Sequence, residues 1–370
     1  MKNKKFIAFI IGGLRSGGAE KVCIALINEF HIRGYKVGLI VLNLHDEKLL
    51  KQLDKDIAFQ NLDKLHTRAA TFHLYKVLKK WKVDICLSFN FQLSVQLILL
   101  KKLLGLKYII YSRGINTFSQ KISKEKSFRH KYFNAFIIKR LYNKSDYFIA
   151  QSTGMKKDMI LSLSIPEDKI RIIFNPLFSF ECTNMEYLGD GLKNEKKEIL
   201  FVGSLKNQKN IPFLLESIRE LLNYRCDFIF RIVGEGSLRM DLEGQMRLLE
   251  LENYVSFEGF SHETYNYYKK ADVFILGSWY EGFPNVLVEA LSYGVPVVSI
   301  DCMSGPSDII AENVNGYLVD GYDKTLFASK INQALNKEWN VKLILQSIQK
   351  FNFDKIYNQY EQYLTHEESN

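Results

Sequence analysis

The stretch ADVFILGSWYEGFPNVLVEALSYGVPVVSI, residues 271–300, decides the fold of this 370-residue chain. Its two apolar runs, VFIL and VPVVSI, are typical of buried strands, and the segment between them predicts a loop followed by a helix of about ten residues. We expect Pro284 at the first helical position, where its missing N–H costs nothing. The stretch therefore predicts one repeat of an α/β fold.

Two carboxylates flank the start of this predicted helix: Glu281 in the loop and Glu289 on the helix, eight positions apart. At roughly 1.5 Å per helical residue their separation approaches about 12 Å, so they can bind opposite ends of an extended ligand. The N–H groups at the helix N-terminus between them favour a phosphate. This order indicates a receptor for a sugar–diphosphate–nucleoside; the alternative is a capped helix with two acidic residues facing water.

The length of 370 residues predicts two domains, and a hydrophobic content of 47% with 25% charged residues is typical of a globular protein. The five cysteines show no CxxC spacing, which indicates free thiols in a reducing compartment rather than disulfides or a zinc site. The apolar run at 6–11 meets a glycine-rich loop and predicts a first strand, not a signal peptide. No apolar run of about 20 residues predicts a membrane span.

Charge is divided unevenly along the chain. Residues 1–178 contain 32 Lys and Arg against 13 Asp and Glu, a net of +19, and the remainder contains 18 against 28, a net of −10. Segment 101–144 holds twelve basic residues and one acidic residue, interleaved with aromatic and aliphatic ones. It predicts an interfacial helix on an anionic membrane surface, or alternatively a helix packed on its own domain. No nucleic-acid-binding pattern accompanies it, so we expect no nucleic-acid partner.

Short apolar runs alternate with helical stretches along most of the chain. The predicted strands in the first half are 6–11, 36–44, 84–89, 108–112, 146–152 and 171–176, and those before the opening stretch are 198–204, 228–234 and 254–259. Predicted later helices are 211–223, 237–249, 325–337 and 341–363. This alternation predicts two doubly wound α/β domains, at 1–180 and 195–350. We also expect the helix at about 350–370 to pack back on the first domain.

Glycine-rich loops follow the first strand of each predicted domain. The first loop carries Gly17 and Gly18 but no G-x-G-x-x-G, which disfavours a nicotinamide dinucleotide and indicates close approach of a ligand phosphate or an acceptor to the backbone. Gly203 opens the second loop, GSLKNQKN. Its Lys209, just before the next helix, is expected to place an ammonium against a diphosphate.

Together these motifs resemble the family 4 retaining glycosyltransferases of the GT-B fold, especially the bacterial branch that builds surface polysaccharides and lipid-linked oligosaccharides. The matching stretches span most of the chain: GGAE at 17–20, Asn175-Pro176, GSLKNQKN at 203–210, IVGEGSLR at 232–239, YVSFEGF at 254–260, the segment 278–310 and Asn315-Gly316. The resemblance implies two Rossmann-like domains that face each other across a cleft.

The resemblance also implies roles for single residues. Glu281 would bind hydroxyls of the donor sugar, Lys209 would neutralise the diphosphate leaving group, and Glu289 would bind the ribose. Further contacts to substrates are implied for Gly17, Gly18, Arg113, Gly203, Lys206, Gly234, Glu235, Gly282, Phe283, Pro284, Asn285, Val286 and Leu287.

Two positions depart from the family pattern. Ser204 stands where the family usually carries Arg, and we expect Lys206 or Arg15 to supply the missing charge. Arg113 is the nearest candidate where many relatives carry His near the donor sugar.

The reaction implied by the resemblance is transfer of a hexose or N-acetylhexosamine, with retention, from a UDP-linked donor to a lipid-linked (polyprenyl-diphosphate) or polysaccharide-precursor acceptor. No DxD-like pair ends a predicted strand, so we expect neither an obligatory metal nor another cofactor. The expected location is the cytoplasm, peripheral on the inner face of the membrane. The alternatives are a GDP-mannose-dependent mannosyltransferase, a sugar-nucleotide epimerase or hydrolase, and a non-catalytic partner subunit.

Overall fold

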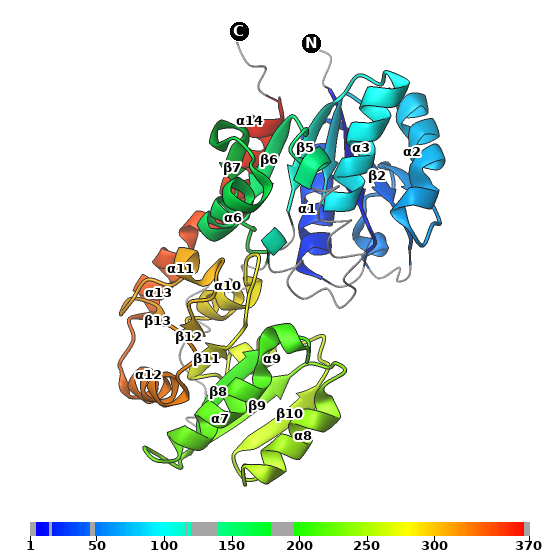
Figure 1. The fold of residues 1–370 in the computed structure, drawn as a ribbon. Coiled ribbons are helices and arrows are strands. Elements are labelled where there is room, and N and C mark those ends of the chain that lie inside the picture. Colours follow the sequence, from blue (N-terminus) through cyan, green and yellow to red (C-terminus); the bar gives the residue numbers. More distant parts are fainter. Residues whose placement is uncertain are drawn as a thin grey trace. The chain divides into compact units, whose positions relative to one another are not determined.

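The structure is a computed structural model that describes residues 5–14, 17–44, 49–114, 117–119, 139–178 and 196–365. The chain forms two compact units: the first is Met1–Pro176 together with Phe353–Asn370, and the second is Leu177–Asn352. Each unit contains one sheet of parallel strands with helices packed on it (Figure 1). The predicted class, two doubly wound α/β units, is confirmed.

The sheet of the first unit has seven strands in the order β3-β2-β1-β4-β5-β6-β7. Their bounds are β1 (Phe6–Ile11), β2 (Lys36–Val41), β3 (Ala58–Asn61), β4 (Ile85–Ser88), β5 (Ile109–Arg113), β6 (Tyr147–Ala150) and β7 (Ile170–Ile172). The central strand β1 is buried along its whole length, and Phe9 aligns with Leu39 on one side and Leu87 on the other. Burial on both faces explains why such strands appear as continuous apolar runs. Edge strand β3 escaped prediction because its residues are only partly buried.

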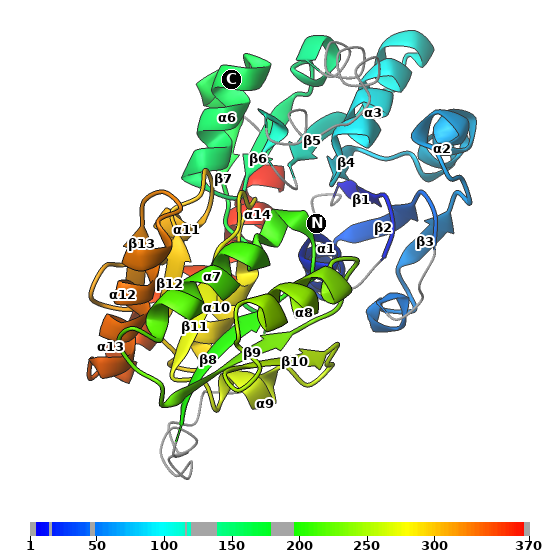
Figure 2. The same ribbon diagram turned by 60° about the horizontal axis from the view of Figure 1, so that its bottom comes forward.

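The helices of the first unit lie on the two faces of its sheet (Figure 2). They include α1 (Gly18–Ile32), α2 (Thr67–Trp81), α3 (Phe91–Leu104), α6 (Thr153–Leu163) and α14 (Phe353–Thr365), with short 3-10 turns η1 (Leu50–Gln52) and η2 (Glu167–Lys169). One core cluster joins α1 and α14 to the sheet through Phe30 and Tyr357, and a second joins α2 and α3 through Leu74 and Leu97. The last helix of the chain is therefore an integral part of the first unit.

The single helix predicted at 341–363 is wrong, because the structure divides it into α13 (Val341–Ser347), η6 (Gln349–Phe351) and α14. The two halves bury their apolar faces in different units: Phe351 belongs to the second unit and Ile356 to the core of the first. Asn352, with extended φ and ψ of −53° and 137°, separates them. The chain passes between the units twice, after Pro176 and after Asn352. The N–H of Leu177 donates to the carbonyl of Phe351 at 2.8 Å, so these two connections lie side by side.

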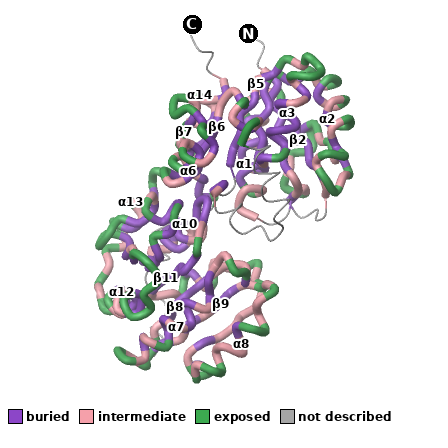
Figure 3. Tube along the Cα trace, in the orientation of Figure 1, coloured by how far each residue is buried: buried purple, intermediate pink, exposed green. Residues whose placement is uncertain are grey.

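The sheet of the second unit has six strands in the order β10-β9-β8-β11-β12-β13. They are β8 (Lys197–Val202), β9 (Phe228–Val233), β10 (Val255–Gly259), β11 (Val273–Leu276), β12 (Val297–Ile300) and β13 (Gly316–Val319), and β13 was not predicted. The helical elements are η5 (Asn207–Lys209), α7 (Ile211–Leu221), α8 (Arg239–Leu248), α9 (Tyr265–Tyr268), α10 (Asn285–Ser292), α11 (Pro306–Ile309), α12 (Lys324–Asn336) and α13. The strands form the buried centre of the unit (Figure 3).

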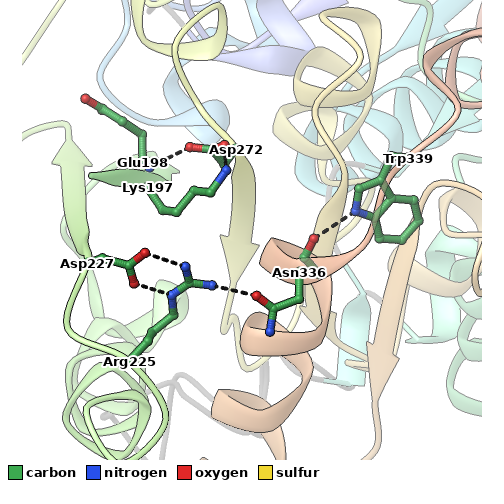
Figure 4. Close-up of polar contacts among 8 residues, drawn as sticks. Lys197, Glu198, Arg225, Asp227, Asp272, Asn336 and Trp339 are labelled. Carbon is green, nitrogen blue, oxygen red and sulfur yellow. Dashed lines mark hydrogen bonds and ion pairs between the residues drawn. The ribbon is translucent and has the colours of Figure 1, made fainter. Parts of the chain in front are cut away.

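Partly buried polar contacts stabilise the amino-terminal edge of this second sheet (Figure 4). Lys197, at the start of β8, pairs with Asp272, just before β11, at 2.9 Å. Arg225 forms a two-pronged bond to Asp227, before β9, with both contacts at 2.7 Å, and also reaches Asn336 at 3.1 Å. Ligands of open α/β sheets bind at the opposite, carboxyl edge of the strands.

Candidate functional site

Three loops meet at the carboxyl edge of the second sheet, after β8, β9 and β11. The backbones of the first two touch: the N–H of Leu205 donates to the carbonyl of Glu235 at 3.0 Å. A Cβ on Gly234 would clash with the carbonyl of Gly203, and one on Gly236 with the backbone of Leu205. Gly234 also has φ of +148°, which side chains rarely adopt. The glycines of IVGEGSLR therefore serve the packing of one loop on the other.

Lys209 and Glu281 form a buried ion pair between the loops after β8 and β11. The Lys209 Nζ atom lies 2.6 Å from Glu281 Oε1, and the two side chains are 16% and 7% exposed. The hydroxyl of Ser278 donates to the same oxygen at 2.6 Å, and the Gln208 amide donates to the carbonyl of Tyr280 at 2.9 Å. A buried carboxylate needs such partners, because an unpaired charge away from water is costly. The structure thus brings together the two residues predicted to act at the sugar and the diphosphate.

Ser204 and Lys206 lie in the same loop as Lys209 but contribute differently. Ser204 is half-buried, and its carbonyl accepts a hydrogen bond from the Lys206 N–H at 2.9 Å. The Lys206 side chain is exposed. A Cβ on Gly203 would lie 3.7 Å from the Lys209 Cε atom, so this glycine borders the lysine stem. The cation that meets Glu281 is therefore Lys209, while Lys206 faces water.

Glu235 lies at the exposed rim of this edge. Its carboxylate pairs with Arg239, which also binds Glu243 at 2.8 Å. Arg239 occupies the place of the third glycine of a dinucleotide motif, and its guanidinium lies 5.7 Å from the centre of the Phe257 ring. Ion pairs between charged side chains thus stabilise the loop after β9. One of these side chains, Arg239, stands where a G-x-G-x-x-G motif would have its third glycine.

The start of α10 differs from the prediction. The helix begins at Asn285, and Pro284 is the capping residue before it, with non-helical φ and ψ of −79° and 83°. Two amides expected to hold a phosphate are used internally: the Asn285 N–H donates to the Phe283 carbonyl and the Leu287 N–H to the Pro284 carbonyl, each at 3.0 Å. Pro284 has no N–H. The amide donors of Gly282 and Val286 are among those that remain as candidates for an anion contact.

The loop before α10 is held in shape by the segment after β12. The Ser304 hydroxyl donates to the Gly282 carbonyl at 3.0 Å. Gly305 has φ of +102°, and a Cβ there would clash with the ring of Pro284. Phe283 is buried and packs edge-on against Phe351 at 5.3 Å. Sequence reasoning gave no role to Ser304 or Gly305, although both lie in the matching stretch.

The thiol of Cys302 lies beside the buried ion pair. Burial raises its pKa to about 12; the Glu281 carboxylate adds to the rise and the Lys209 ammonium opposes it. The thiol therefore stays neutral near pH 7, and it is a packing residue rather than a nucleophile.

Glu289 projects from α10 and is half-buried. Its Oε2 atom accepts a hydrogen bond from the hydroxyl of Tyr268 at 3.0 Å. Its environment differs from that of Glu281, which has a cationic partner. Sequence reasoning missed Tyr268 because nothing in its spacing relates α9 to α10.

Gly17 and Gly18 lie in the first unit at the start of α1. Gly17 is the capping residue and carries no side chain to bind the first N–H groups. A Cβ on Gly17 would clash with the carboxylate of Glu20. Arg15, proposed above as a second source of charge, lies outside the described residues.

The position of Arg113 contradicts the expected donor contact. Its side chain is fully buried in the first unit, where Nε donates to the Tyr360 hydroxyl at 2.9 Å and Nη2 to the Asn175 side chain at 2.5 Å. The guanidinium also lies 5.0 Å from the centre of the Phe89 ring. Arg113 therefore links α14 and the segment around Asn175 to the sheet, and its side chain has no exposed surface, although its Nη1 atom has no hydrogen-bond partner among the described residues.

Only part of the basic segment 101–144 is described, because 115–116 and 120–138 lie outside the described residues. A cavity of about 640 Å³ borders it, and its described lining residues are Lys102, Lys139, Arg140, Leu141, Asn143, Lys144, Leu163 and Ser164. Four are basic and none is acidic. Nearby Leu103 is 77% exposed. No helix in the described ranges is long and apolar enough to cross a bilayer.

One group of described side chains has the spacing of metal ligands: His31, Asp54 and Asp56. The two aspartates are exposed, and His31 lies at the far end of α1 from Gly17 and Gly18. Exposed acidic groups of this kind are common without a metal. The group is separate from the loops that hold Lys209 and Glu281.

Comparison with known proteins identifies the family of this chain. The family described as "Glycosyltransferase Family 4" matches residues 16–177, and "Glycosyl transferases group 1" matches residues 189–350. An alpha-1,4-N-acetyl-D-galactosaminyltransferase of Campylobacter jejuni, named for a glycan on PP-undecaprenol, is 30% identical over 90% of this chain and 89% of its own length. The amylovoran biosynthesis glycosyltransferase AmsD of Erwinia amylovora is 25% identical over 90% and 91%.

Solved structures show the same fold. The lipopolysaccharide outer core galactosyltransferase WaaB superimposes with a TM-score of 0.79 at 22% identity, covering 96% of this chain and 98% of WaaB. HepE of Anabaena in complex with UDP gives 0.78 at 17% identity, covering 97% and 99%. The chain belongs to the family 4 glycosyltransferases of the GT-B fold, in the branch that builds bacterial surface polysaccharides and lipid-linked glycans.

Proposed function

We propose that the second unit binds a nucleotide sugar, with the sugar at Glu281, the diphosphate at Lys209 and the ribose at Glu289. The buried pair of Lys209 and Glu281, 2.6 Å apart at the carboxyl edge of the sheet, is the observation that supports this most strongly. Such a pair is expensive to desolvate, so its presence in a loop region favours a role in binding or catalysis over one in stability.

The pair also indicates how the donor enters. In the structure the Lys209 ammonium is paired with the Glu281 carboxylate. A diphosphate that approaches the loop offers the ammonium a second anionic partner, and the carboxylate then becomes available to sugar hydroxyls. Negative charge grows on the diphosphate as the anomeric C–O bond breaks. Lys209 and the amides of Gly282 and Val286 are the groups proposed to stabilise it, and loss of one such donor typically costs about 10²–10³ in turnover.

For the donor we propose a UDP-linked hexose or N-acetylhexosamine, transferred with retention and without an obligatory metal. Support comes from relatives named as galactosyl- and N-acetylgalactosaminyltransferases and from a structural neighbour that holds UDP. Transfer unchanged by EDTA and a product of unchanged anomeric configuration by NMR are the expected results. A strict preference for GDP-mannose would identify the alternative mannosyltransferase.

The proposed acceptor is a lipid-linked, polyprenyl-diphosphate glycan or a polysaccharide precursor, reached from the cytoplasmic face of the membrane. The cavity lined by Lys102, Lys139, Arg140 and Lys144, with exposed Leu103 beside it, supports an anionic surface as the partner of the first unit. The protein should float with liposomes that contain anionic lipid and be released by salt. Equal flotation with neutral liposomes, or none with anionic ones, would contradict the membrane contact.

The central experiment is transfer of radiolabelled sugar from a panel of nucleotide sugars to a lipid-linked acceptor. Glu281→Gln and Lys209→Met should each lower turnover by about 10²-fold or more. Lys270→Met, at an exposed lysine before β11, is the control and should act as wild type. Near wild-type transfer by both site variants would overturn the assignment, and conversion of the donor without acceptor would indicate an epimerase or hydrolase.

A further inference from the structure

Tyr268 is a buried tyrosine at the end of α9 whose hydroxyl contacts Glu289. It is 1% exposed, and the distance from its hydroxyl to Glu289 Oε2 is 3.0 Å. Its ring lies parallel to that of Tyr293, with centroids 5.6 Å apart and planes 7° apart, and 5.9 Å from Phe274 of β11. The ring is thus wedged between a strand and the end of α10, so its hydroxyl has a fixed position.

The contact leaves half of the Glu289 carboxylate available. Oε2 is held by Tyr268, while Oε1 meets no hydrogen-bond donor within the described ranges. The main chain of Glu289 is fixed as well, because its carbonyl accepts from the Ser292 hydroxyl at 2.7 Å. A half-buried carboxylate with one oxygen anchored and one open is suited to a neutral ligand that donates from adjacent hydroxyl groups.

The protonation of Tyr268 suits this arrangement. Burial raises the pKa of its phenol well above its ordinary value, and the Glu289 carboxylate raises it further. The hydroxyl therefore remains a donor throughout the physiological pH range, and it restricts the glutamate to orientations in which Oε2 faces the core. A glutamate without this contact would sample several rotamers at the rim, and ordering them would weaken ligand binding.

We propose that Tyr268 is the positioning residue for Glu289 and that this pair sets the selectivity of the protein for the ribose diol of its nucleotide. The inference rests on the proposed function, in which Glu289 binds the ribose. Tyr268 itself does not touch the ligand; it acts by holding the carboxylate that does.

The test compares the binding of UDP and 2′-deoxy-UDP by calorimetry, with GDP and 2′-deoxy-GDP as the pair if GDP binds more tightly. Wild type should prefer the ribonucleotide by about tenfold or more, because the carboxylate binds a hydroxyl that the analogue lacks. Tyr268→Phe keeps the ring and removes only the hydroxyl. We expect it to weaken ribonucleotide binding by about 5- to 20-fold and to reduce the preference to about threefold or less, with a raised donor KM and little change in kcat.

Tyr267→Phe is the matched control on the same helix. The hydroxyl of Tyr267 reaches Glu258 instead, at 3.5 Å, so its loss should leave both affinities unchanged. Glu289→Gln distinguishes failure of the proposed ribose site from failure of the positioning role of Tyr268. If it keeps the ribose preference, or if no nucleotide binds to wild type, the proposed function fails. If Glu289→Gln abolishes the preference and Tyr268→Phe retains it in full, the ribose site stands and the positioning role of Tyr268 is refuted.

Discussion

The Lys209–Glu281 pair should show strong energetic coupling even in the absence of substrate. Coulomb's law at an effective dielectric constant of about 20 gives roughly 6 kcal/mol of gross attraction at the observed 2.6 Å. Desolvation of the two ions opposes this by several kcal/mol. We therefore expect Lys209→Met to lower the free energy of unfolding by about 3 kcal/mol and Glu281→Gln by about 2 kcal/mol. The double variant should lose about 3 kcal/mol rather than 5, a coupling of about 2 kcal/mol.

The assay is urea unfolding of the full chain, followed by tryptophan fluorescence, because Trp279 stands two residues before Glu281. The matched control is the Lys197–Asp272 pair at the opposite edge of the same sheet, 2.9 Å apart and with side chains 40% and 33% exposed (Figure 4). Its coupling should stay below about 1 kcal/mol, as for exposed ion pairs. Additive losses for Lys209 and Glu281 within about 0.5 kcal/mol would refute the reasoning.

Three further predictions follow from the second unit. Gly234→Ala should lower both the free energy of unfolding and the affinity for the donor, because the added Cβ would clash with the backbone of the loop after β8. A Cβ added at Gly244 on α8 would meet nothing within 4 Å, so Gly244→Ala should stabilise the protein by about 1 kcal/mol in thermal unfolding. Partial desolvation and the neighbouring carboxylates of Asp320 and Asp308 raise the pKa of Asp301, although its side chain is exposed, so its ionisation as pH rises disfavours folding. In urea titrations Asp301→Asn should therefore gain a small stability advantage over wild type on going from about pH 4 to about pH 7, and an equal difference at both pH values would contradict this. Alkylation followed by mass spectrometry should label exposed Cys226 quickly and Cys302 slowly, since burial raises the Cys302 pKa to about 12; equal rates would exclude a buried thiol.

The sequence by itself determined the fold class, and it singled out the two residues that form the buried ion pair. Strands buried on both faces must be apolar along their whole length, so they appear in the sequence as short continuous runs. In an α/β sheet the residues after such runs meet at one edge. Lys209 and Glu281, each in a loop after a predicted strand, were assigned to two parts of one nucleotide sugar, and in the structure they lie 2.6 Å apart at this edge.

Only the tertiary structure decided which polar side chains are occupied by contacts within the protein. Arg113 has the charge expected of a donor contact, but its position at the end of β5 buries it against Tyr360, a residue 247 positions away in the sequence. Tyr268 reaches Glu289 across 21 positions through the packing of two helices that no periodicity relates. Sequence spacing reports only local neighbours and the faces of one element. Contacts between elements depend on how the helices pack on the sheet, and this packing decides whether a polar side chain supports the fold or remains available to a ligand.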